Sequence, residues 1–347
     1  MLKLKEIAKL ANVSPATVSL VLNSRAGVSD EKRAYILQLL QENGYRINPP
    51  KTERKRRIRF LKYYKHSYLV NGNPGFVNQI VDAVEGECRA RNINLMITSA
   101  DINSFGRDEI VSMLKNDSVD GLIMLGTELQ PKDMKVVEDI RCPVVVVDNS
   151  LEYAPYSCVT MNNATAIRNV VIYLSSLGHR RIGFLANSIP ACNCDSRRKS
   201  YISTMDEIGL GENKLIFDIT PSLEGSYEDT LSLLEQGVRF PAALVANNDC
   251  IALGAMRAFQ QFGIRIPEDI SIFGFDGIDF SAVSNPPLST NKVSCEAMGI
   301  WAVQLLCSHI ESPQMPPIKI HVNTSLLLRD SVIPYRASGD YHPSVLA

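Results

Sequence analysis

From residue 58 onward, short apolar runs alternate with longer amphipathic ones, and this alternation constrains the fold more than any other feature of the chain. Runs rich in Val, Ile and Leu, the expected strands, occupy 58–64, 94–98, 121–125, 144–148, 181–186, 243–246 and 270–274. The helical spacing of apolar residues recurs between them, over 77–91, 164–177, 230–236 and 251–262. Because apolar strands joined by helical crossovers form parallel sheets covered on both faces, we expect an α/β body. Ligands of such sheets bind beyond the carboxyl ends of the strands.

The first 47 residues show a different pattern, that of three short helices. Apolar residues spaced three and four apart predict a first helix over 4–11. Ser14 stands where a helix N-cap belongs, and a proline follows at the first helical position, so a second helix is expected over 15–22. A third helix begins at a cap on Ser29 and ends at Gly44. A helix, a short turn and a second short helix make a helix-turn-helix.

Charge is divided unevenly along the chain. Residues 1–62 hold 14 Lys and Arg against 5 Asp and Glu, a net charge of +9, whereas residues 63–347 hold 22 against 32, a net charge of −10. The basic part ends in a run of Lys and Arg over 54–57. A basic head predicts contact with a polyanion, and its helix-turn-helix pattern indicates DNA. Without DNA binding, the same segment would be a small three-helix bundle.

Several classes of protein are excluded by what the sequence lacks. No apolar run approaches the roughly 20 residues that span a bilayer, and no signal-peptide pattern opens the chain, so we expect a cytoplasmic protein without a membrane partner. No Gly-x-Gly-x-x-Gly, Walker loop or Gly-x-Ser-x-Gly motif occurs, so we expect neither an enzyme nor a bound cofactor. The eight cysteines are interpreted as buried apolar residues and no metal site is expected, although the close pair Cys192 and Cys194 leaves a metal or redox role open.

Several motifs together point to one family. The head contains Val-Ser-Pro-Ala-Thr-Val-Ser at 13–19 and Val-Leu-Asn at 21–23. The body contains Pro-Val-Val-Val-Val-Asp at 143–148, Gly-His-Arg-Arg-Ile-Gly at 178–183 and Asp-Ile-Ser-Ile-Phe-Gly-Phe-Asp at 269–276. With these motifs the chain resembles the lactose-repressor/galactose-repressor family of bacterial transcription factors over about residues 4–332. The body of that family is similar to periplasmic sugar-binding proteins.

The resemblance implies a domain organisation. A helix-turn-helix DNA-binding domain would occupy 1–47, a basic hinge 48–57, an effector-binding core 58–332 and a loose tail 333–347. The core would have two Rossmann-like α/β halves with parallel sheets, as in periplasmic binding proteins, and the effector would bind in the cleft between them. The halves are expected at 58–160 with 290–320, and at 161–289 with 321–332. A homodimer is also implied, with contact surfaces in 67–130, 251–262 and 277–284.

The resemblance further implies which residues of the head contact DNA. Helix 14–22 would be the recognition helix in the major groove. Its base-facing residues would be Pro15, Ala16 and Leu20, which offer apolar contact instead of hydrogen bonds, although Leu20 could be a core residue. The remaining contacts of the head, mainly to phosphates, are expected from Ser14, Thr17, Ser19, Asn23, Tyr45 and Asn48.

The hinge departs from the family pattern. Typical members wedge a leucine into the minor groove at this point, but Arg54 stands in its place. One interpretation is that Arg54, Arg56 and Arg57 enter a narrow A·T-rich minor groove. The other, which we favour, is a charged linker that contacts only phosphates.

For the effector, the resemblance points to polar residues at strand ends and to aromatic rings. Sugar sites use carboxylates and amides for hydroxyl pairs, an arginine, and an aromatic face against the ring. The matching positions are Phe76, Asp148, Arg197, Tyr227, Asn248 and Asp276. Arg197 and Asp276 could instead pair mainly with each other, and Phe76 could belong to the core. The implied ligand is a mono- or oligosaccharide.

The expected function combines these parts. A cytoplasmic, nucleoid-associated homodimer would bind a two-fold symmetric double-stranded DNA operator, repress carbohydrate-related genes and respond to a sugar-like effector. Two alternatives stay open. One is a regulator that binds DNA constitutively and answers no ligand, and the other is a sugar-binding protein without a role in gene control.

Overall fold

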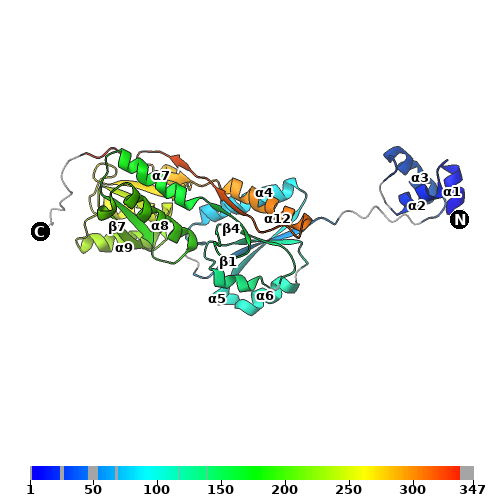
Figure 1. The fold of residues 1–347 in the computed structure, drawn as a ribbon, viewed down its shortest axis with the longest axis horizontal. Coiled ribbons are helices and arrows are strands. Elements are labelled where there is room, and N and C mark those ends of the chain that lie inside the picture. The colour runs from blue at the N-terminus through cyan, green and yellow to red at the C-terminus, as the bar shows by residue number, and fades with distance from the viewer. Residues whose placement is uncertain are drawn as a thin grey trace. The chain divides into compact units, whose positions relative to one another are not determined.

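The computed structural model describes residues 2–23, 27–45, 54–66, 69–116, 118–138 and 140–336. Internal contacts divide the chain into two units, Met1–Arg56 and Arg57–Ala347, which we describe separately (Figure 1). No helix in the described ranges is long and apolar enough to cross a membrane.

The first unit is the expected bundle of three helices, α1 (Leu4–Leu10), α2 (Pro15–Leu22) and α3 (Asp30–Glu42). The helices share a small core of fully buried side chains: Ile7, Ala8, Val18, Val21, Ile36 and Leu40. Gly44, with a φ of +77°, ends α3 as predicted. Ser29 precedes α3, but its side chain makes no capping hydrogen bond.

The first half of the second unit is built on a six-stranded sheet in the order β11-β5-β4-β3-β1-β2. Its strands, all parallel, are β1 (Arg57–Tyr64), β2 (Asn94–Asp101), β3 (Gly121–Leu125), β4 (Val144–Val147), β5 (Ser157–Met161) and β11 (Lys319–Val322). Helices α4 (Pro74–Ala90) and α12 (Cys295–Glu311) cover one face, and α5 (Ile102–Phe105) and α6 (Arg107–Asn116) cover the other (Figure 1). A 3-10 turn, η1 (Pro131–Val136), precedes β4.

Successive strand residues divide between these two faces because side chains alternate along a strand. In β1, for example, Ile58 and Phe60 pack with α4, while Leu61 and Tyr63 pack on the side of α6. The strands therefore bury both faces, as the continuous apolar runs predicted.

The second half repeats this arrangement, with strand order β12-β10-β9-β8-β6-β7. Its strands are β6 (Ile182–Asn187), β7 (Leu215–Ile219), β8 (Ala243–Ala246), β9 (Ser271–Asp276), β10 (Ser289–Lys292) and β12 (Ser325–Leu327), and only β12 runs antiparallel to its neighbour. Helices α7 (Asn163–Ser176) and α8 (Cys192–Glu207) cover one face, and α9 (Leu223–Glu235) and α10 (Asp249–Gln261) the other. Two short turns, η2 (Gly211–Asn213) and α11 (Phe280–Val283), complete the half.

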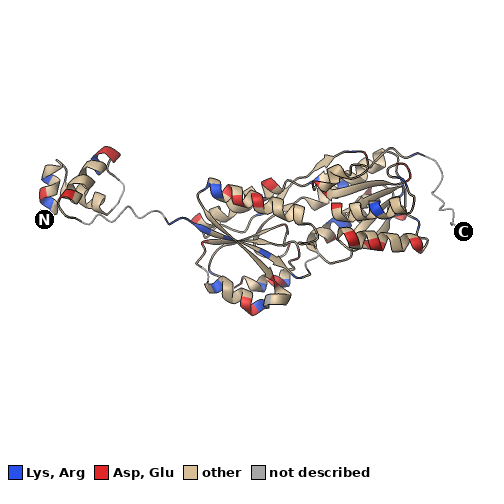
Figure 2. Cartoon of the chain, turned by 180° about the vertical axis from the view of Figure 1, so that it is seen from behind, with Lys and Arg blue, Asp and Glu red and all other residues tan. Residues whose placement is uncertain are grey.

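The chain crosses between the two sheets three times, after β5, after β10 and between β11 and β12. We expected the first half to resume at residue 290, but β10 stays in the second sheet as far as Lys292. Likewise β11 keeps 321–322 in the first sheet, because Val322 pairs with Met161. In Figure 2, the positions of Lys, Arg, Asp and Glu in this unit fall mainly on its helices and loops, as expected for sheets covered on both sides.

The beginning of the predicted loose tail is ordered against the second sheet. The backbone N–H of Ile333 donates to Ser271 Oγ at 3.2 Å, and the backbone N–H of Tyr335 donates to the Leu177 carbonyl at 2.9 Å. The expectation of a loose segment is therefore wrong for 333–336, and residues 337–347 lie outside the described ranges.

Candidate functional site

Two aspartates mark the carboxyl edges of the two sheets. Asp148 directly follows β4 in the first sheet, and Asp276 ends β9 in the second. Both are at least 94% buried, with exposed fractions of 1% and 6%. Their φ angles are +66° and +112°, a region that non-glycine residues rarely adopt and that concentrates at functional sites. Each half therefore holds one strand-end aspartate in a strained backbone conformation that directs its carboxylate toward the other half.

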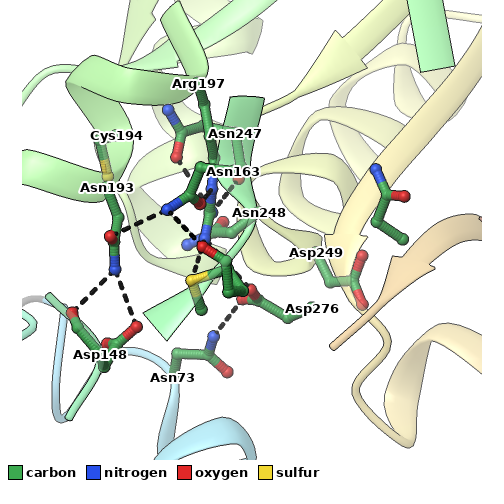
Figure 3. Close-up of polar contacts among 12 residues, drawn as sticks. Asn73, Asp148, Asn163, Asn193, Cys194, Arg197, Asn247, Asn248, Asp249 and Asp276 are labelled. Carbon is green, nitrogen blue, oxygen red and sulfur yellow. Dashed lines mark hydrogen bonds and ion pairs between the residues drawn. The ribbon is translucent and has the colours of Figure 1, made fainter. Parts of the chain in front are cut away.

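Arg197 of α8 is held rigidly next to these aspartates (Figure 3). Its Nε donates to Asn163 Oδ1 at 2.7 Å, and its Nη1 donates to the Asn247 carbonyl at 2.6 Å. Its guanidinium lies over the ring of Phe275, 3.6 Å from the centroid. The remaining nitrogen, Nη2, is 3.8 Å from Asp276 Oδ1. These contacts leave the arginine no freedom to swing away from the carboxylate.

Amide side chains join the two halves directly. Asn193, in the first turn of α8, donates from Nδ2 to Asp148 Oδ1 and to the Asp148 carbonyl, both at 2.8 Å. Asn73, which precedes α4, donates from Nδ2 to Asp276 Oδ2 at 2.6 Å (Figure 3). The Cys250 thiol also donates to the Gly72 carbonyl at 3.3 Å. The two halves are therefore in direct contact through polar groups that a ligand could replace.

The electrostatics of this cluster are those of carboxylates out of water. Burial raises the pKa of Asp148 to about 6, against the lowering effects of the Thr127 hydroxyl and of Arg197. Burial likewise raises the pKa of Asp276, which Arg197 lowers. One cation thus faces two strand-end carboxylates, and hydroxyl donors from a ligand would relieve their desolvation.

A third carboxylate, Asp249 in the first turn of α10, supports this edge of the second sheet. Its Oδ2 accepts hydrogen bonds from the backbone N–H groups of Gly277 and Ile278, both at 2.9 Å, and its Oδ1 accepts from the Thr290 hydroxyl at 2.6 Å. Burial raises its pKa to about 7, in opposition to these hydrogen bonds. Because the turn it holds follows Asp276 directly, Asp249 positions that carboxylate.

Two buried polar atoms beside the cluster keep spare hydrogen-bonding capacity. Asn73 Oδ1 and Asn247 Nδ2 have no hydrogen-bond partner within the described ranges, although both residues bond through their other groups. One is an acceptor and the other a donor, and buried atoms of this kind seldom stay unpaired. They are suited to the donor and acceptor sides of a ligand hydroxyl.

The cleft does not have the composition of a metal centre. Across the described ranges, no three His, Cys, Asp or Glu side chains are grouped in a way that could hold a metal ion. Cys194 instead accepts a hydrogen bond from Asn187 Nδ2, with an Sγ–Nδ2 distance of 3.0 Å, and burial raises its pKa to about 11. Cys192 donates weakly to the Leu129 carbonyl at 3.8 Å.

In the first unit, α2 presents a small polar surface on a tightly capped helix. Ser14 Oγ accepts from the backbone N–H of Thr17 at 3.1 Å and lies 2.8 Å from the Thr17 hydroxyl. Pro15, Ala16 and Ser19 are exposed, whereas Val18 and Val21 on the opposite side are buried. A helix that offers small side chains and no acidic residue can approach a phosphate-rich surface closely.

Comparisons with known proteins agree with this geometry. The profile of the "Bacterial regulatory proteins, lacI family" matches residues 3–48, and that of the "Periplasmic binding protein-like domain" matches residues 171–332. The ribose operon repressor of Haemophilus influenzae is 30% identical over 334 residues, which cover 96% of this chain and 99% of that protein. The chain belongs to the lacI family of bacterial regulatory proteins.

Solved structures support the same fold for this lacI-family protein. The transcriptional regulator CelR in complex with cellobiose has a TM-score of 0.69 at 23% identity, covering 96% of this chain and all of that one. A lac repressor dimer bound to operator and the anti-inducer ONPF has a TM-score of 0.71 at 22% identity, covering 96% and 99%. Family membership makes the chain a DNA-binding transcriptional regulator and not an enzyme, as the sequence predicted.

The structure brings some of the predicted effector residues of this lacI-family protein together. Asp148, Arg197 and Asp276 form the cluster, and Asn248 borders it, where its Oδ1 caps α10 by accepting from the Ile251 N–H at 2.8 Å. The expected pairing of Arg197 with Asp276 is present but long.

The two predicted aromatic residues both make packing contacts. Phe76 is buried in the first turn of α4, in the apolar core. Tyr227 lies between α9 and α10, where its hydroxyl donates to Gln261 Oε1 at 2.7 Å and its ring faces Arg257. Both rings thus have packing partners, and their contact with a ligand stays a prediction.

Several residues that we predicted to contact DNA have hydrogen-bond partners within the protein. Tyr45 donates from its hydroxyl to the Leu2 carbonyl at 2.6 Å and so fastens the N-terminal segment to the head. Asn23 donates to the Ser19 carbonyl at 2.9 Å, and Leu20 is half-buried outside the shared core. Arg57 begins β1, with its backbone N–H bonded to Asp120 and its guanidinium bonded to Ser118. Asn48 lies outside the described ranges, and Arg54 and Arg56 lie at their edge.

Sequence reasoning missed the amides that complete the cluster: Asn73, Asn163, Asn193 and Asn247. Asn73 precedes Pro74 at the start of a helix, and Asn247 follows β8, so both stand at element ends on the ligand edge of a sheet. Their position at the ends of these elements could have identified them as candidate ligand contacts from the sequence.

Proposed function

We propose that this lacI-family protein is a transcriptional repressor whose effector, a mono- or oligosaccharide, binds among Asp148, Arg197 and Asp276. The observation that carries the proposal is the pairing of amides and carboxylates across the cleft, through Asn193 with Asp148 and Asn73 with Asp276. Each pair matches the donor and acceptor pattern of a sugar hydroxyl, which can donate to a carboxylate and accept from an amide. Asn248 borders the same space.

A sugar would act by replacing contacts between the halves. In the described structure, the carboxylate of each half accepts a hydrogen bond from an amide of the other half. A bound sugar would take over these hydrogen bonds and change how closely the halves approach. Since it interacts differently with the two degrees of closure, it would shift the population between them. Binding of cellobiose by CelR, a protein of the same fold, supports a sugar as ligand.

The repressor is proposed to act as a homodimer on a two-fold symmetric operator in the bacterial cytoplasm. Large exposed apolar side chains occur in two of the three predicted contact segments: Met96 and Ile97 on edge strand β2, and Phe280 and Val283 on α11. Unprotected edge strands and clustered apolar residues favour association. The lac repressor of the same fold is a dimer on its operator. The double variant Phe280→Asp/Val283→Asp should be monomeric in light scattering. The control Tyr153→Asp, at a 91% exposed residue outside these segments, should remain a dimer.

On DNA, α2 is proposed to enter the major groove. Pro15, Ala16 and Leu20 would contact bases through apolar surfaces, and Ser14, Thr17, Ser19 and Asn23 would contact phosphates. Tyr45 and Asn48 would support the edge of this interface, while Arg54, Arg56 and Arg57 add phosphate contacts. The affinity should therefore fall steeply with salt concentration.

The decisive experiment measures operator binding with and without sugars. A duplex selected from a random pool by the full-length protein is titrated by fluorescence anisotropy in the presence of single mono- and disaccharides. One sugar should change the affinity by about 5- to 150-fold. Asp276→Asn should abolish that change and keep DNA binding, while Asp218→Asn, at an exposed aspartate paired with Arg198, should keep both. DNA binding unaffected by every sugar would instead indicate the constitutive regulator.

A further inference from the structure

A cavity lies at the opposite edge of the second sheet from Asp276. It has a volume of about 550 Å³ and is lined by residues at the amino ends of three strands, with Arg181 before β6, Ala242 before β8 and Ser271 opening β9. Asp276 ends the same strand β9 in the cleft. At about 3.3 Å per residue, the two ends of β9 are about 17 Å apart, so a ligand in one site does not occupy the other.

One wall of this cavity is preformed by the segment 333–336. Three hydrogen bonds hold the segment: Ile333 N–H to Ser271 Oγ at 3.2 Å, His179 Nε2 with the Ile333 carbonyl at 3.0 Å, and Tyr335 N–H to the Leu177 carbonyl at 2.9 Å. The ring of Tyr335 also meets the buried ring of His179 edge to face, with centroids 5.7 Å apart. A ligand would therefore meet an ordered wall and bear little cost of ordering it.

The lining is rich in arginine, with four arginines against two acidic residues, Glu268 and Asp269. Arg181, Arg239 and Arg336 all border the cavity and are exposed, and none of them has an ion pair or hydrogen bond within the described ranges. A fourth arginine, Arg265, is neutralised by Asp269 through a bidentate pair, with Nη2–Oδ1 at 2.7 Å and Nε–Oδ2 at 2.9 Å. Three unpaired guanidinium groups around one cavity favour an anion with several oxygens, because the planar fork of arginine matches phosphate and carboxylate geometry.

Apolar rings complete the lining and distinguish it from a simple charged patch. Phe240 and Phe262 contribute to the wall, and Tyr335 is 49% exposed at its edge. Small-molecule sites combine apolar walls with a few convergent polar groups in volumes of about 300–1,000 Å³. The size and the mixture of rings and guanidinium groups suit a small phosphorylated organic molecule better than a free inorganic ion.

We propose that this cavity is a second binding site, for a small phosphorylated metabolite, with Arg181, Arg239 and Arg336 on its phosphate. The proposal is independent of the sugar site, because none of Asp148, Arg197 and Asp276 lines this cavity and Asp276 stands at the other end of β9.

The test is isothermal titration of the full-length protein with three probes, pyrophosphate, AMP and glucose 6-phosphate. At least one organic phosphate should bind more tightly than pyrophosphate. The double variant Arg181→Ala/Arg239→Ala should bind this phosphate about 10- to 100-fold more weakly, because two charge-assisted contacts are lost. Arg180→Ala, at the exposed arginine next in sequence that does not line the cavity, should leave it unchanged. The basic head binds anions equally in all three proteins, so it cannot produce this difference.

Three results would overturn the proposal. The first is an unchanged affinity in the double variant, with unfolding temperatures showing that all proteins are folded. The second is no binding of any probe at millimolar concentration. The third is tighter binding of a Glu-rich peptide than of every probe, which would make the cavity a docking site for an acidic protein segment.

Discussion

Replacing Arg197 by methionine should expose how the cleft balances its charges. Methionine keeps much of the length and apolar contact over Phe275 but removes the only cation that faces Asp276 in the described structure. Asn163 Oδ1 and the Asn247 carbonyl lose their donors at the same time. Removing one partner of a buried charge pair costs about 3–5 kcal/mol, because an uncompensated charge stays behind. We expect a loss of this size in the free energy of unfolding at pH 8.

The size of this loss should depend on pH, with a sign that follows from the raised pKa of Asp276. Burial already raises that pKa and Arg197 opposes the rise, so the variant shifts it further upward. At pH values between the Asp276 pKa of the wild type and that of the variant, the folded Arg197→Met protein holds a proton that the folded wild type does not. The difference in stability therefore grows with rising pH by about 1.4 kcal/mol per pH unit. The cost of the substitution should consequently be smallest at acid pH, where both folded proteins hold this proton, and should not fall as the pH rises.

Urea denaturation of both proteins at pH 5.5 and pH 8, followed by far-UV circular dichroism, measures this. Arg198→Met is the matched control, because Arg198 is the next residue, is 36% exposed and pairs with the exposed Asp218. That surface pair is worth less than about 1 kcal/mol, so the control should unfold like wild type at both pH values. The reasoning is refuted if Arg197→Met costs less than about 1 kcal/mol at pH 8, which is well below the range for buried pairs, or if its cost is larger at pH 5.5 than at pH 8.

Three further predictions concern stability. Burial raises the pKa of Asp148 to about 6 and of Asp249 to about 7, so the folded protein releases these protons at higher pH than the unfolded chain, and the free energy of unfolding should fall between about pH 4 and pH 7. Urea titrations across this range should show a shallower fall for Asp148→Asn, and an equal slope would contradict the assignment. Ser14→Ala removes the cap on the Thr17 N–H and should cost α2 about 1 kcal/mol, seen as faster amide hydrogen exchange in that helix while α3 is less affected. Gly299→Ala would place a methyl group 2.5 Å from Ala83 Cβ where α12 crosses α4, and should destabilise the protein by about 1–3 kcal/mol. Gly86→Ala, in the same helix pair but next to open space, should instead stabilise it by up to about 1 kcal/mol in thermal unfolding. A similar effect for both variants would show that the helix crossing can relax.

Local chemistry explains what could be predicted from the sequence. Ser14 followed by a proline defines the start of α2 through the capping hydrogen bond itself, and the run of four valines over 144–147 can form only a strand buried on both faces. Asp148 and Asp276 follow such strands directly, so their place at the ligand edge came with the strands.

The missed elements lack such local signals. Strand β10 consists of Ser, Thr, Asn and Lys, and it is a strand because β9 and β12 pair with it on either side. The bond between Asn73 and Asp276 joins residues 203 positions apart, so no pattern within one segment announces it. Tyr227 was assigned to the ligand by resemblance, whereas its actual neighbours, Arg257 and Gln261, come from the packing of α9 on α10.

The three crossings between the sheets have a consequence during protein synthesis. Strand β5 pairs with β11, so Met161 must wait for Val322, and α12, which covers β3 and β4, is also made late. At about 5–20 residues per second, a ribosome needs roughly 10–30 s to make the intervening chain. Throughout that time the first sheet has an unpaired edge, and until α12 is made only α4 covers that face, while strands β6 to β10 emerge in one uninterrupted stretch. The second half can thus gather most of its strands first, and the nascent first half is the part of this regulator that needs protection from aggregation.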